Sequence, residues 1–364
     1  MSTLQILINL KAHQPLVILN QKDIFAVNLD EFSIPYIVIG GGDPLKNFAS
    51  SNLYLKLRAI VEILLYNLRI WRALWETNTA ALQCEETGAL LVCFGTKLAG
   101  KKLVIYVRNS FRGDSLRGVY KLPMWFADSV VGISAEVSRF LLEKGGLNIR
   151  RKVTQIYNGL DLSEAAHFKR QFTKQECRAH LEIPAECTAV GIVAFIDERK
   201  QQREFLRYVA NGFKKNAKMR FYFIGGIKNE MYMTECMEIV LELYLENVFF
   251  VGVRSNMSEW YRSLDIVCLP SEREGVPRAL IEASAFELPT VAFDIPGCRE
   301  AVVDHETGFV VQSFDEFSAR LEELANNPSL CREMGQKGCA YVSEHFDAVR
   351  NTAAIERIYE TIQK

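Results

Sequence analysis

The second half of the chain alternates short apolar runs with longer amphipathic stretches. The runs are rich in β-branched and aromatic residues and lie at 188–195, 219–225, 248–253, 265–269 and 289–293. The stretches between them show helical periodicity, at 199–216, 229–245, 256–263 and 278–287. Continuously apolar strands connected through helices predict a parallel sheet covered on both faces. Such sheets bind ligands beyond the carboxyl ends of their strands, so chemistry is expected at that edge.

The first half of the chain is less regular. Its apolar runs predict strands at 16–20, 35–40, 89–94, 103–107 and 129–133. Its helical patterns lie at 52–76 and at 134–144, and Ser134 is placed to cap the second of these. A last helical pattern, at 346–361, has no strand after it. The first half therefore predicts a second parallel-sheet domain.

The Asn158-Gly159 turn within 156–163 is the predicted hinge between the two domains. We predict an N-terminal Rossmann-like domain from 1–160, which the C-terminal helix 346–364 joins, and a C-terminal domain from 161–345.

Composition narrows the class of protein. A hydrophobic fraction of 49% and a charged fraction of 24% are those of a globular protein able to bury two cores. The net charge of −1 gives no global reason to expect a nucleic-acid partner. The nine cysteines form no C-x-x-C pair, which argues against zinc and favours a reducing compartment. No signal peptide pattern and no apolar run of about 18 residues occur, so we predict a cytoplasmic protein.

The segment 265–311 carries the clearest chemistry. A buried strand ends at Pro270, a polar loop follows, and Pro277 stands where a first helical residue is expected. The backbone N–H groups at 275–278 would then be unpaired at a helix N-terminus, which suits a diphosphate. Gly275 has no side chain to block close approach.

Glu274 and Glu282 lie on either side of this helix start, and each carboxylate can accept two hydroxyl donors. Beside a phosphate, Glu274 would be repelled unless the helix dipole and Arg273, Arg278 or Lys200 offset its charge. Taken alone, the pair is more simply explained by an ordinary helix-start acid at Glu274 and a solvated side chain at Glu282.

The context of this pair is more specific. Glu274-x7-Glu282, within PSEREGVPRALIEASAFELPTVAFDIPGCREAV, resembles the E-x7-E signature of glycosyltransferase family 4, the retaining GT-B enzymes. Asn158-Gly159-Leu160-Asp161 resembles the hinge motif of that family. The resemblance covers 125–364 well and 1–124 loosely. It implies an α/β GT-B fold, in which two Rossmann-like domains with parallel sheets face each other across a cleft.

The resemblance also implies roles for single residues. Glu274 would bind hydroxyls of the donor sugar, Lys200 would neutralise the leaving diphosphate, and Glu282 would hold the ribose hydroxyls. Further donor contacts would come from Gly275, Val276, Pro277 and, near the base, Arg254. No metal or other cofactor is expected, because the chain has no D-x-D motif.

Three positions depart from the family pattern. Ala194-Phe195 replaces a Gly-Arg pair whose arginine grips phosphate, and Arg199 is the candidate substitute. Arg108, followed by Asn109, replaces a histidine; an arginine cannot act as a base but could bind an acceptor phosphate or a donor hydroxyl. The usual first strand and its Gly-rich loop are not recognisable, and GGGDP at 40–44 is interpreted as a turn.

Basic and aromatic residues in the first half suggest an acceptor or a surface. Six basic residues lie in the 21-residue stretch from Lys101 to Lys121. The helix at 53–75 combines leucines with Trp71 and Trp75. A phosphate-bearing acceptor or an anionic membrane surface would explain these residues. A solvated loop explains the basic run equally well, and packing on its own sheet is the more common explanation of the helix at 53–75.

The resulting hypothesis is a retaining, metal-independent hexosyltransferase. It would move a sugar from a nucleotide diphosphate donor, a UDP-sugar being favoured, to a glycan or lipid-linked acceptor in surface polysaccharide synthesis. It would work in the cytoplasm, either free or peripheral at the inner membrane face. The alternative is a catalytically impaired GT-B homologue that acts as a binding or scaffold subunit.

Overall fold

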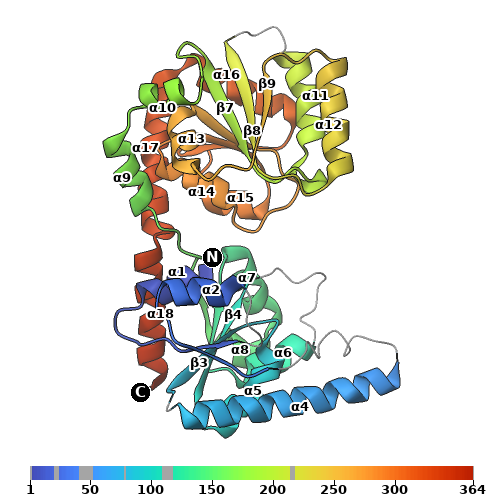
Figure 1. Ribbon diagram of the computed structural model, residues 1–364, viewed down its shortest axis with the longest axis vertical. Helices are drawn as coiled ribbons and strands as arrows, with labels where there is room; N and C mark the ends of the chain where they lie inside the picture. The colour runs from blue at the N-terminus through green and yellow to red at the C-terminus, as the bar shows by residue number, and fades with distance from the viewer. Residues whose placement is uncertain are drawn as a thin grey trace. The chain divides into compact units, whose positions relative to one another are not determined.

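The computed structural model describes residues 2–19, 24–40, 52–77, 79–108, 118–213 and 218–363. Asn109 and most of the predicted turn at 40–44 lie outside these residues. The chain forms two compact units, Met1–Leu160 with Ala348–Lys364, and Asp161–Asp347 (Figure 1).

The C-terminal unit is built on a six-stranded parallel sheet in the order β12-β11-β10-β7-β8-β9. Its strands are β7 (Thr188–Val193), β8 (Met219–Ile224), β9 (Val248–Gly252), β10 (Ile266–Leu269), β11 (Thr290–Phe293) and β12 (Gly308–Val311). The chain runs outward from β7 through β8 to β9 and then returns to the other side of β7 as β10. The strand order therefore reverses between β7 and β10, and sheets of this kind bind ligands in a crevice at the carboxyl ends of the strands at such a point.

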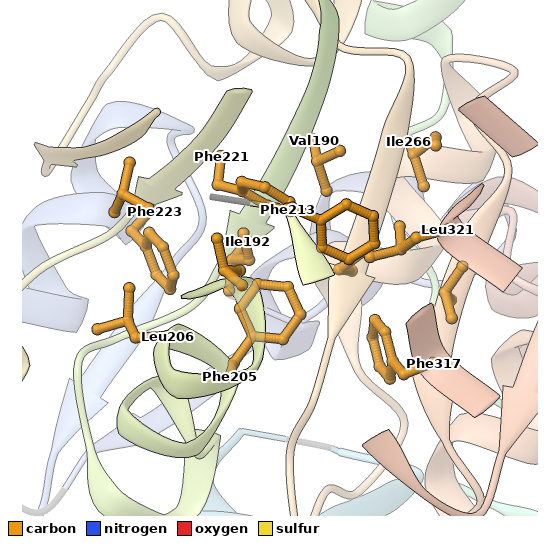
Figure 2. Close-up of a cluster of buried hydrophobic side chains, with 14 of the residues drawn as sticks. Val190, Ile192, Phe205, Leu206, Phe213, Phe221, Phe223, Ile266, Phe317 and Leu321 are labelled. Atoms are coloured by element: carbon orange, nitrogen blue, oxygen red, sulfur yellow. The ribbon is translucent and has the colours of Figure 1, made fainter. Parts of the chain in front are cut away.

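Helices cover both faces of this sheet. They are α9 (Ser163–Gln171), α10 (Lys174–His180), η1 (Glu198–Lys200), α11 (Gln202–Gly212), α12 (Glu230–Glu242), α13 (Met257–Ser263), α14 (Arg278–Ala285), α15 (Pro296–Ala301), α16 (Phe314–Asn326) and α17 (Pro328–His345). Figure 2 shows the core beneath α11 and α16, where the ring of Phe205 packs edge-on against Phe221, Phe223 and Phe317. This aromatic core fixes the strands whose ends carry the site.

The N-terminal unit contains a parallel four-stranded sheet in the order β3-β4-β5-β6 and a parallel pair, β1-β2. The strands are β1 (Val17–Leu19), β2 (Tyr36–Val38), β3 (Ala81–Glu85), β4 (Lys102–Val107), β5 (Ser129–Gly132) and β6 (Val153–Gln155). The helices are α1 (Ser2–Asn9), α2 (Ile24–Glu31), α4 (Leu53–Glu76), α5 (Ala89–Leu98), α6 (Gly118–Phe126), α7 (Ala135–Lys144), α8 (Gly146–Arg150) and α18 (Ala348–Gln363).

Alternate residues of β4 face two separate cores. Leu103 and Ile105 pack with residues of α4, α5 and α7, while Val104 and Tyr106 pack with residues of α1 and α18. The sheet is thus buried on both faces, as a parallel sheet requires. The prediction of an α/β fold with parallel sheets in both halves is confirmed.

The predicted strand at 89–94 is wrong, because this run forms the buried helix α5. A run of buried apolar residues looks the same in a strand and in a helix enclosed on several sides. The strand that pairs with β4 is instead β3, whose sequence ALQCE is too polar to be recognised. Strand β12, with the sequence GFVV, was also not predicted.

The predicted helices at 52–76 and 134–144 are confirmed as α4 and α7, and Ser134 caps α7 by accepting from the Val137 N–H at 3.1 Å. Within the described residues, no helix combines the length and the apolar character needed to cross a bilayer.

Candidate active site

The loops that follow β7 and β10 meet at the carboxyl edge of the C-terminal sheet. The Glu272 N–H donates to the Arg199 carbonyl at 2.9 Å, which ties the two loops together. The Lys200 ammonium forms an ion pair with Glu274, and the two side chains are only 18% and 14% exposed. Two predicted site residues that are far apart in sequence therefore lie in contact at the crevice.

Asp197 organises the first of these loops. Its carboxylate caps η1 by accepting from the Arg199 N–H at 3.0 Å, and it also accepts from the Arg199 guanidinium at 3.0 Å. Lys228, from the loop after β8, approaches the same carboxylate at 3.2 Å. Hydrogen bonding from Arg199, aided by Lys228, holds the pKa of Asp197 well below its usual range. Arg199 thus lies beside Lys200, but its side chain is engaged with Asp197 and not with Glu274.

The second loop leads into α14. Pro277 caps the helix, which begins at Arg278, one residue later than predicted. The backbone N–H groups of Gly275 and Val276 make no hydrogen bond to any described residue. Nothing among the described residues lies within 4 Å of the place a Gly275 Cβ would take. The loop therefore offers bare amides next to open space, as an anion site requires.

Gly297 holds this loop from the opposite side. A Cβ at Gly297 would lie 1.3 Å from the carbonyl oxygen of Gly275, so the start of α15 can pack here only without a side chain. The adjacent thiol, Cys298, is fully buried, and burial raises its pKa. A buried thiol with a raised pKa is a poor nucleophile, which leaves Cys298 as a packing residue.

Glu282 lies just over one turn into α14 and is held by two side chains. The Tyr261 hydroxyl donates to its Oε2 at 2.9 Å, and the Arg278 guanidinium donates to its Oε1 at 3.3 Å. Burial, and then the charge of Glu282, raise the pKa of Tyr261 far above its usual range, so the hydroxyl remains a donor. The carboxylate is one-third exposed and keeps acceptor capacity for a ligand.

For two further predicted site residues, Arg254 and Arg108, the contacts in the structure do not decide the predicted role. Arg254 follows β9, is exposed, and donates to the carbonyl of Val253 at 3.0 Å. In the N-terminal unit, Arg108 follows β4 and pairs with Glu85 at 2.9 Å, while its guanidinium also donates to the Thr3 hydroxyl at 2.8 Å. Within the described part of the chain, no group of three His, Cys, Asp or Glu side chains is arranged to hold a metal ion.

Sequence reasoning missed several residues that shape the site. Tyr261, Asp197 and Gly297 had no assigned role, although Gly297 lies inside the segment 265–311, which carries the clearest chemistry. Phe195 is 61% exposed beside Val253, and both approach Gly226 at the carboxyl edge. Phe195 and Val253 therefore form an exposed apolar surface at the position where the family pattern has a phosphate-binding arginine.

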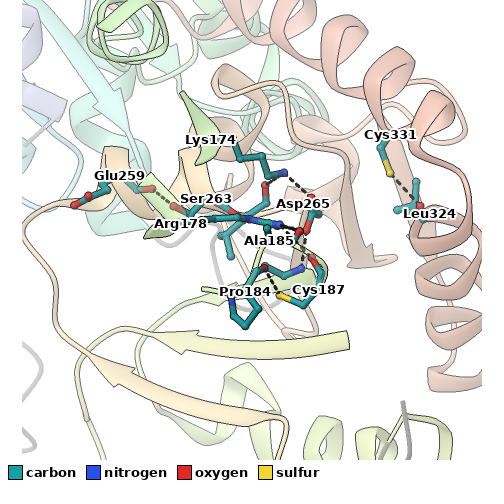
Figure 3. Close-up of polar contacts among 12 residues, drawn as sticks. Lys174, Arg178, Pro184, Ala185, Cys187, Glu259, Ser263, Asp265, Leu324 and Cys331 are labelled. Carbon is teal, nitrogen blue, oxygen red and sulfur yellow. Dashed lines mark hydrogen bonds and ion pairs between the residues drawn. The ribbon is translucent and has the colours of Figure 1, made fainter. Parts of the chain in front are cut away.

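The opposite edge of the same sheet carries a second charged cluster, shown in Figure 3. Lys174 and Arg178 on α10 both pair with Asp265, next to a cavity of about 420 Å³. Arg178 also donates to the carbonyls of Ser263, at 2.9 Å, and Ala185, at 3.0 Å. This cluster lies at the amino ends of β7 and β10, away from the bare amides of the crevice.

The chain resembles known proteins both in sequence and in fold. Residues 173–340 match the family model described as glycosyl transferases group 1. The capsular polysaccharide biosynthesis glycosyltransferase CapM of Staphylococcus aureus is 24% identical over 274 residues, which cover 71% of this chain and 70% of CapM.

Two solved structures share the fold. HepE from Anabaena, crystallised in complex with UDP, superposes with a TM-score of 0.80 at 18% identity, covering 99% of this chain and 95% of HepE. A glycosyltransferase from Rickettsia africae gives a TM-score of 0.83 at 18% identity, covering 100% of this chain and 94% of its own. Identities this low show the fold alone, which is that of GT-B enzymes.

Proposed function

We propose that this chain, a homologue of the group 1 glycosyltransferases with a GT-B fold, is a retaining, metal-independent hexosyltransferase of family 4. It transfers a sugar from a nucleotide diphosphate donor, a UDP-sugar being favoured, to a glycan or lipid-linked acceptor in surface polysaccharide synthesis. The observation that carries the proposal is the Lys200–Glu274 pair beside the bare amides of Gly275 and Val276. CapM, by its name, acts in capsular polysaccharide biosynthesis, and HepE binds UDP.

The diphosphate of the donor sits against the loop that begins α14. The N–H groups of Gly275 and Val276 donate to its oxygens, and the helix N-terminus adds a favourable dipole. Negative charge grows on the diphosphate as the sugar departs, and a fixed cation nearby lowers the energy of that state. Lys200 supplies this cation, and Arg199 adds positive charge to the same loop.

The Lys200–Glu274 pair keeps both groups in place until the donor arrives. A nearly buried ammonium or carboxylate without a partner would be costly, so each stabilises the other in the empty site. Donor binding lets Lys200 turn to the diphosphate, which releases Glu274 to accept hydroxyl groups of the sugar.

The nucleoside is held by α14 and by the loop after β9. Glu282, positioned by Tyr261 and Arg278, accepts hydrogen bonds from the ribose hydroxyls. Pro277 lines the diphosphate, and the backbone at Arg254 faces the base.

Acceptor residues belong to the N-terminal unit. Arg108 follows β4 and is held by Glu85 and Thr3, and it binds an acceptor phosphate or a donor hydroxyl together with Asn109. A lipid-linked acceptor would bring the enzyme to the cytoplasmic face of the inner membrane as a peripheral protein.

A nucleotide screen tests the donor site first. UDP at about 100 times its Kd should stabilise the folded chain by about 2.7 kcal/mol, because a ligand that binds only the folded state must raise its stability. GDP and ADP should shift the unfolding temperature less. UDP-sugars with glycan and lipid-linked acceptors then test turnover, and NMR of the anomeric proton tests retention. If no nucleotide shifts the unfolding temperature, the donor site is refuted.

One observation favours a second candidate, a scaffold subunit without turnover. Phe195 stands exposed where the related enzymes carry a phosphate-gripping arginine. Nucleotide binding without product, across the donor panel and with lipid-linked acceptors included, would support this alternative.

A further inference from the structure

Helix α4 (blue in Figure 1) exposes a long apolar face. Ten large apolar side chains between Leu53 and Trp75 have exposed fractions from 36% to 71%, and we call them the α4 stripe. Leu57, Leu64, Leu68 and Trp75 follow one another at helical spacing along its centre. The stripe is about 33 Å long at 1.5 Å per residue, and a contiguous exposed apolar face of this kind marks an interaction surface.

The opposite face of α4 is locked onto its own unit, so the stripe cannot turn inward. The Asn67 amide donates to the carbonyl of Leu90 at 3.1 Å and accepts from the Gly95 N–H at 2.9 Å. A Cβ at Gly95 would lie 2.1 Å from the Asn67 carbonyl oxygen, so α5 and α4 touch backbone to backbone. A buried amide with its partners in place is costly to displace, which fixes the rotation of α4.

The width of the stripe argues for a flat occupant. At 100° per residue, the side chains from Ile60 across to Leu65 span about 140° of the helix circumference. A coiled-coil partner needs only the narrow seam of two positions per heptad. A lipid surface, in contrast, accepts a broad apolar arc along the whole helix.

The charged residues of α4 indicate which kind of surface the α4 stripe would bind. Helix α4 carries four basic residues, Lys56, Arg58, Arg69 and Arg72, and two acidic ones. Both acids are already paired at 2.8 Å, Glu62 with Arg58 and Glu76 with Arg72. The net positive rim would repel a second copy of itself and attract anionic headgroups. Trp71 and Trp75, with ring centroids 6.3 Å apart, and Tyr54 near the other end are side chains favoured at the headgroup level.

We infer that the α4 stripe docks flat on an anionic lipid bilayer, with its aromatic and leucine side chains at the headgroup boundary and its basic rim against lipid phosphates. The inference rests on the proposed function only in that a lipid-linked acceptor would be presented at that surface. No helix among the described residues can cross the bilayer, so docking is peripheral.

Vesicle flotation of the full chain tests the inference. The wild-type protein should float with vesicles containing about 30% phosphatidylglycerol in phosphatidylcholine, float less with phosphatidylcholine alone, and be released by high salt. The double variant Leu64→Gln/Trp75→Gln should partition at least about tenfold less, because it removes large apolar side chains from the contact. The matched control is Met231→Gln/Leu241→Gln on α12, whose side chains are similarly exposed, at 71% and 68%, and it should float like the wild type.

Two outcomes overturn the inference. One is flotation that the α4 double variant leaves unchanged, or no flotation of the wild type with anionic vesicles. The other is a wild-type dimer in lipid-free buffer that the α4 variant converts to a monomer, which would assign the stripe to a second copy. The UDP-induced thermal shift of each variant separates this test from the donor site: a retained shift with lost flotation isolates the lipid contact, and flotation without a shift refutes only the donor proposal.

Discussion

The two ends of the C-terminal sheet each carry a lysine–carboxylate pair, and the pairs differ in what surrounds them. At the amino end, Asp265 accepts from Lys174, from Arg178 and from the Ala189 N–H. Lys174 also donates to the Leu264 carbonyl at 2.7 Å. The protein itself supplies every one of these partners, as expected of a cluster that holds α10 to the sheet.

At the carboxyl end, the partners are incomplete. Among the described residues, the Lys200 ammonium contacts only Glu274, and the N–H groups of Gly275 and Val276 contact none. A cavity of about 420 Å³ lies at the amino end, beside the cluster whose polar groups the protein itself pairs. Unused hydrogen-bonding capacity therefore separates a binding site from a structural cluster better than cavity volume does.

The largest expected effect is on turnover, in Glu274→Gln. The amide keeps the shape of the carboxylate but loses its charge, so turnover should fall by about 10²–10³-fold, as when one charge-stabilising group is removed from an active site. The unfolding temperature should fall only slightly, because the amide oxygen of the new Gln side chain can still accept a hydrogen bond from Lys200. Initial rates of UDP release and thermal unfolding measure both quantities. Glu272→Gln, an exposed neighbour in the same loop, is the control, and full activity of Glu274→Gln would refute the role.

Asp265→Asn should show the reverse pattern. Arg178, whose side chain is 8% exposed, and Lys174 would lose their counter-charge, which should cost about 2–3 kcal/mol after allowance for partial exposure. Urea unfolding measures the loss, and UDP binding should be retained. Glu333→Gln, which breaks an exposed pair with Lys337, should leave the free energy of unfolding almost unchanged. A stable Asp265→Asn protein that no longer binds UDP would reverse the comparison.

The contrast also explains which parts of the fold could be predicted from the sequence. The C-terminal strands β7, β8, β10 and β11 are almost entirely buried, and their β-branched and aromatic runs are separated by clear helices. The run at 89–94 failed because α5, enclosed by α4 and by the sheet, is as uniformly apolar as a strand. Strand β3 was not predicted because its side chains are half-exposed and its sequence is therefore less apolar. Among the described residues it lies at the end of its sheet and pairs with β4 alone.

The candidate site was predictable where chemistry follows from local sequence. Bare amides require a loop, a glycine and a helix start, and 270–278 shows all three in order. Residues that act through contacts distant in sequence could not be found this way. Tyr261 reaches Glu282 from α13, and Gly297 matters only because α15 packs on Gly275.

A smaller effect is expected on nucleotide affinity, in Glu282→Gln. Loss of the charged acceptor for the ribose hydroxyls should weaken UDP binding about tenfold, or about 1.4 kcal/mol. Isothermal titration measures the affinity of both proteins for UDP and for 2′-deoxy-UDP. The loss of affinity caused by Glu282→Gln should be smaller for 2′-deoxy-UDP, because this ligand lacks the 2′-hydroxyl that would donate to Glu282. An equal penalty for both ligands would show that Glu282 does not contact the 2′-hydroxyl.

The smallest expected effect concerns the loop that carries Lys200, and it depends on pH. Arg199, with help from Lys228, lowers the pKa of Asp197 in the folded chain, so the carboxylate contributes stability above its unfolded pKa of about 4. That contribution is lost as pH falls through the lower, folded pKa. Asp197→Asn should therefore cost about 1 kcal/mol or less at pH 7, since Arg199 is half-exposed, and the cost should start to shrink only below about pH 4, with most of it still present at pH 3. Urea unfolding of both proteins from pH 7 down to about pH 2 measures the difference, and a difference that does not change over this range would show that Asp197 holds the loop through hydrogen bonds alone. In that case its Asn variant should also position Lys200 correctly and keep full turnover.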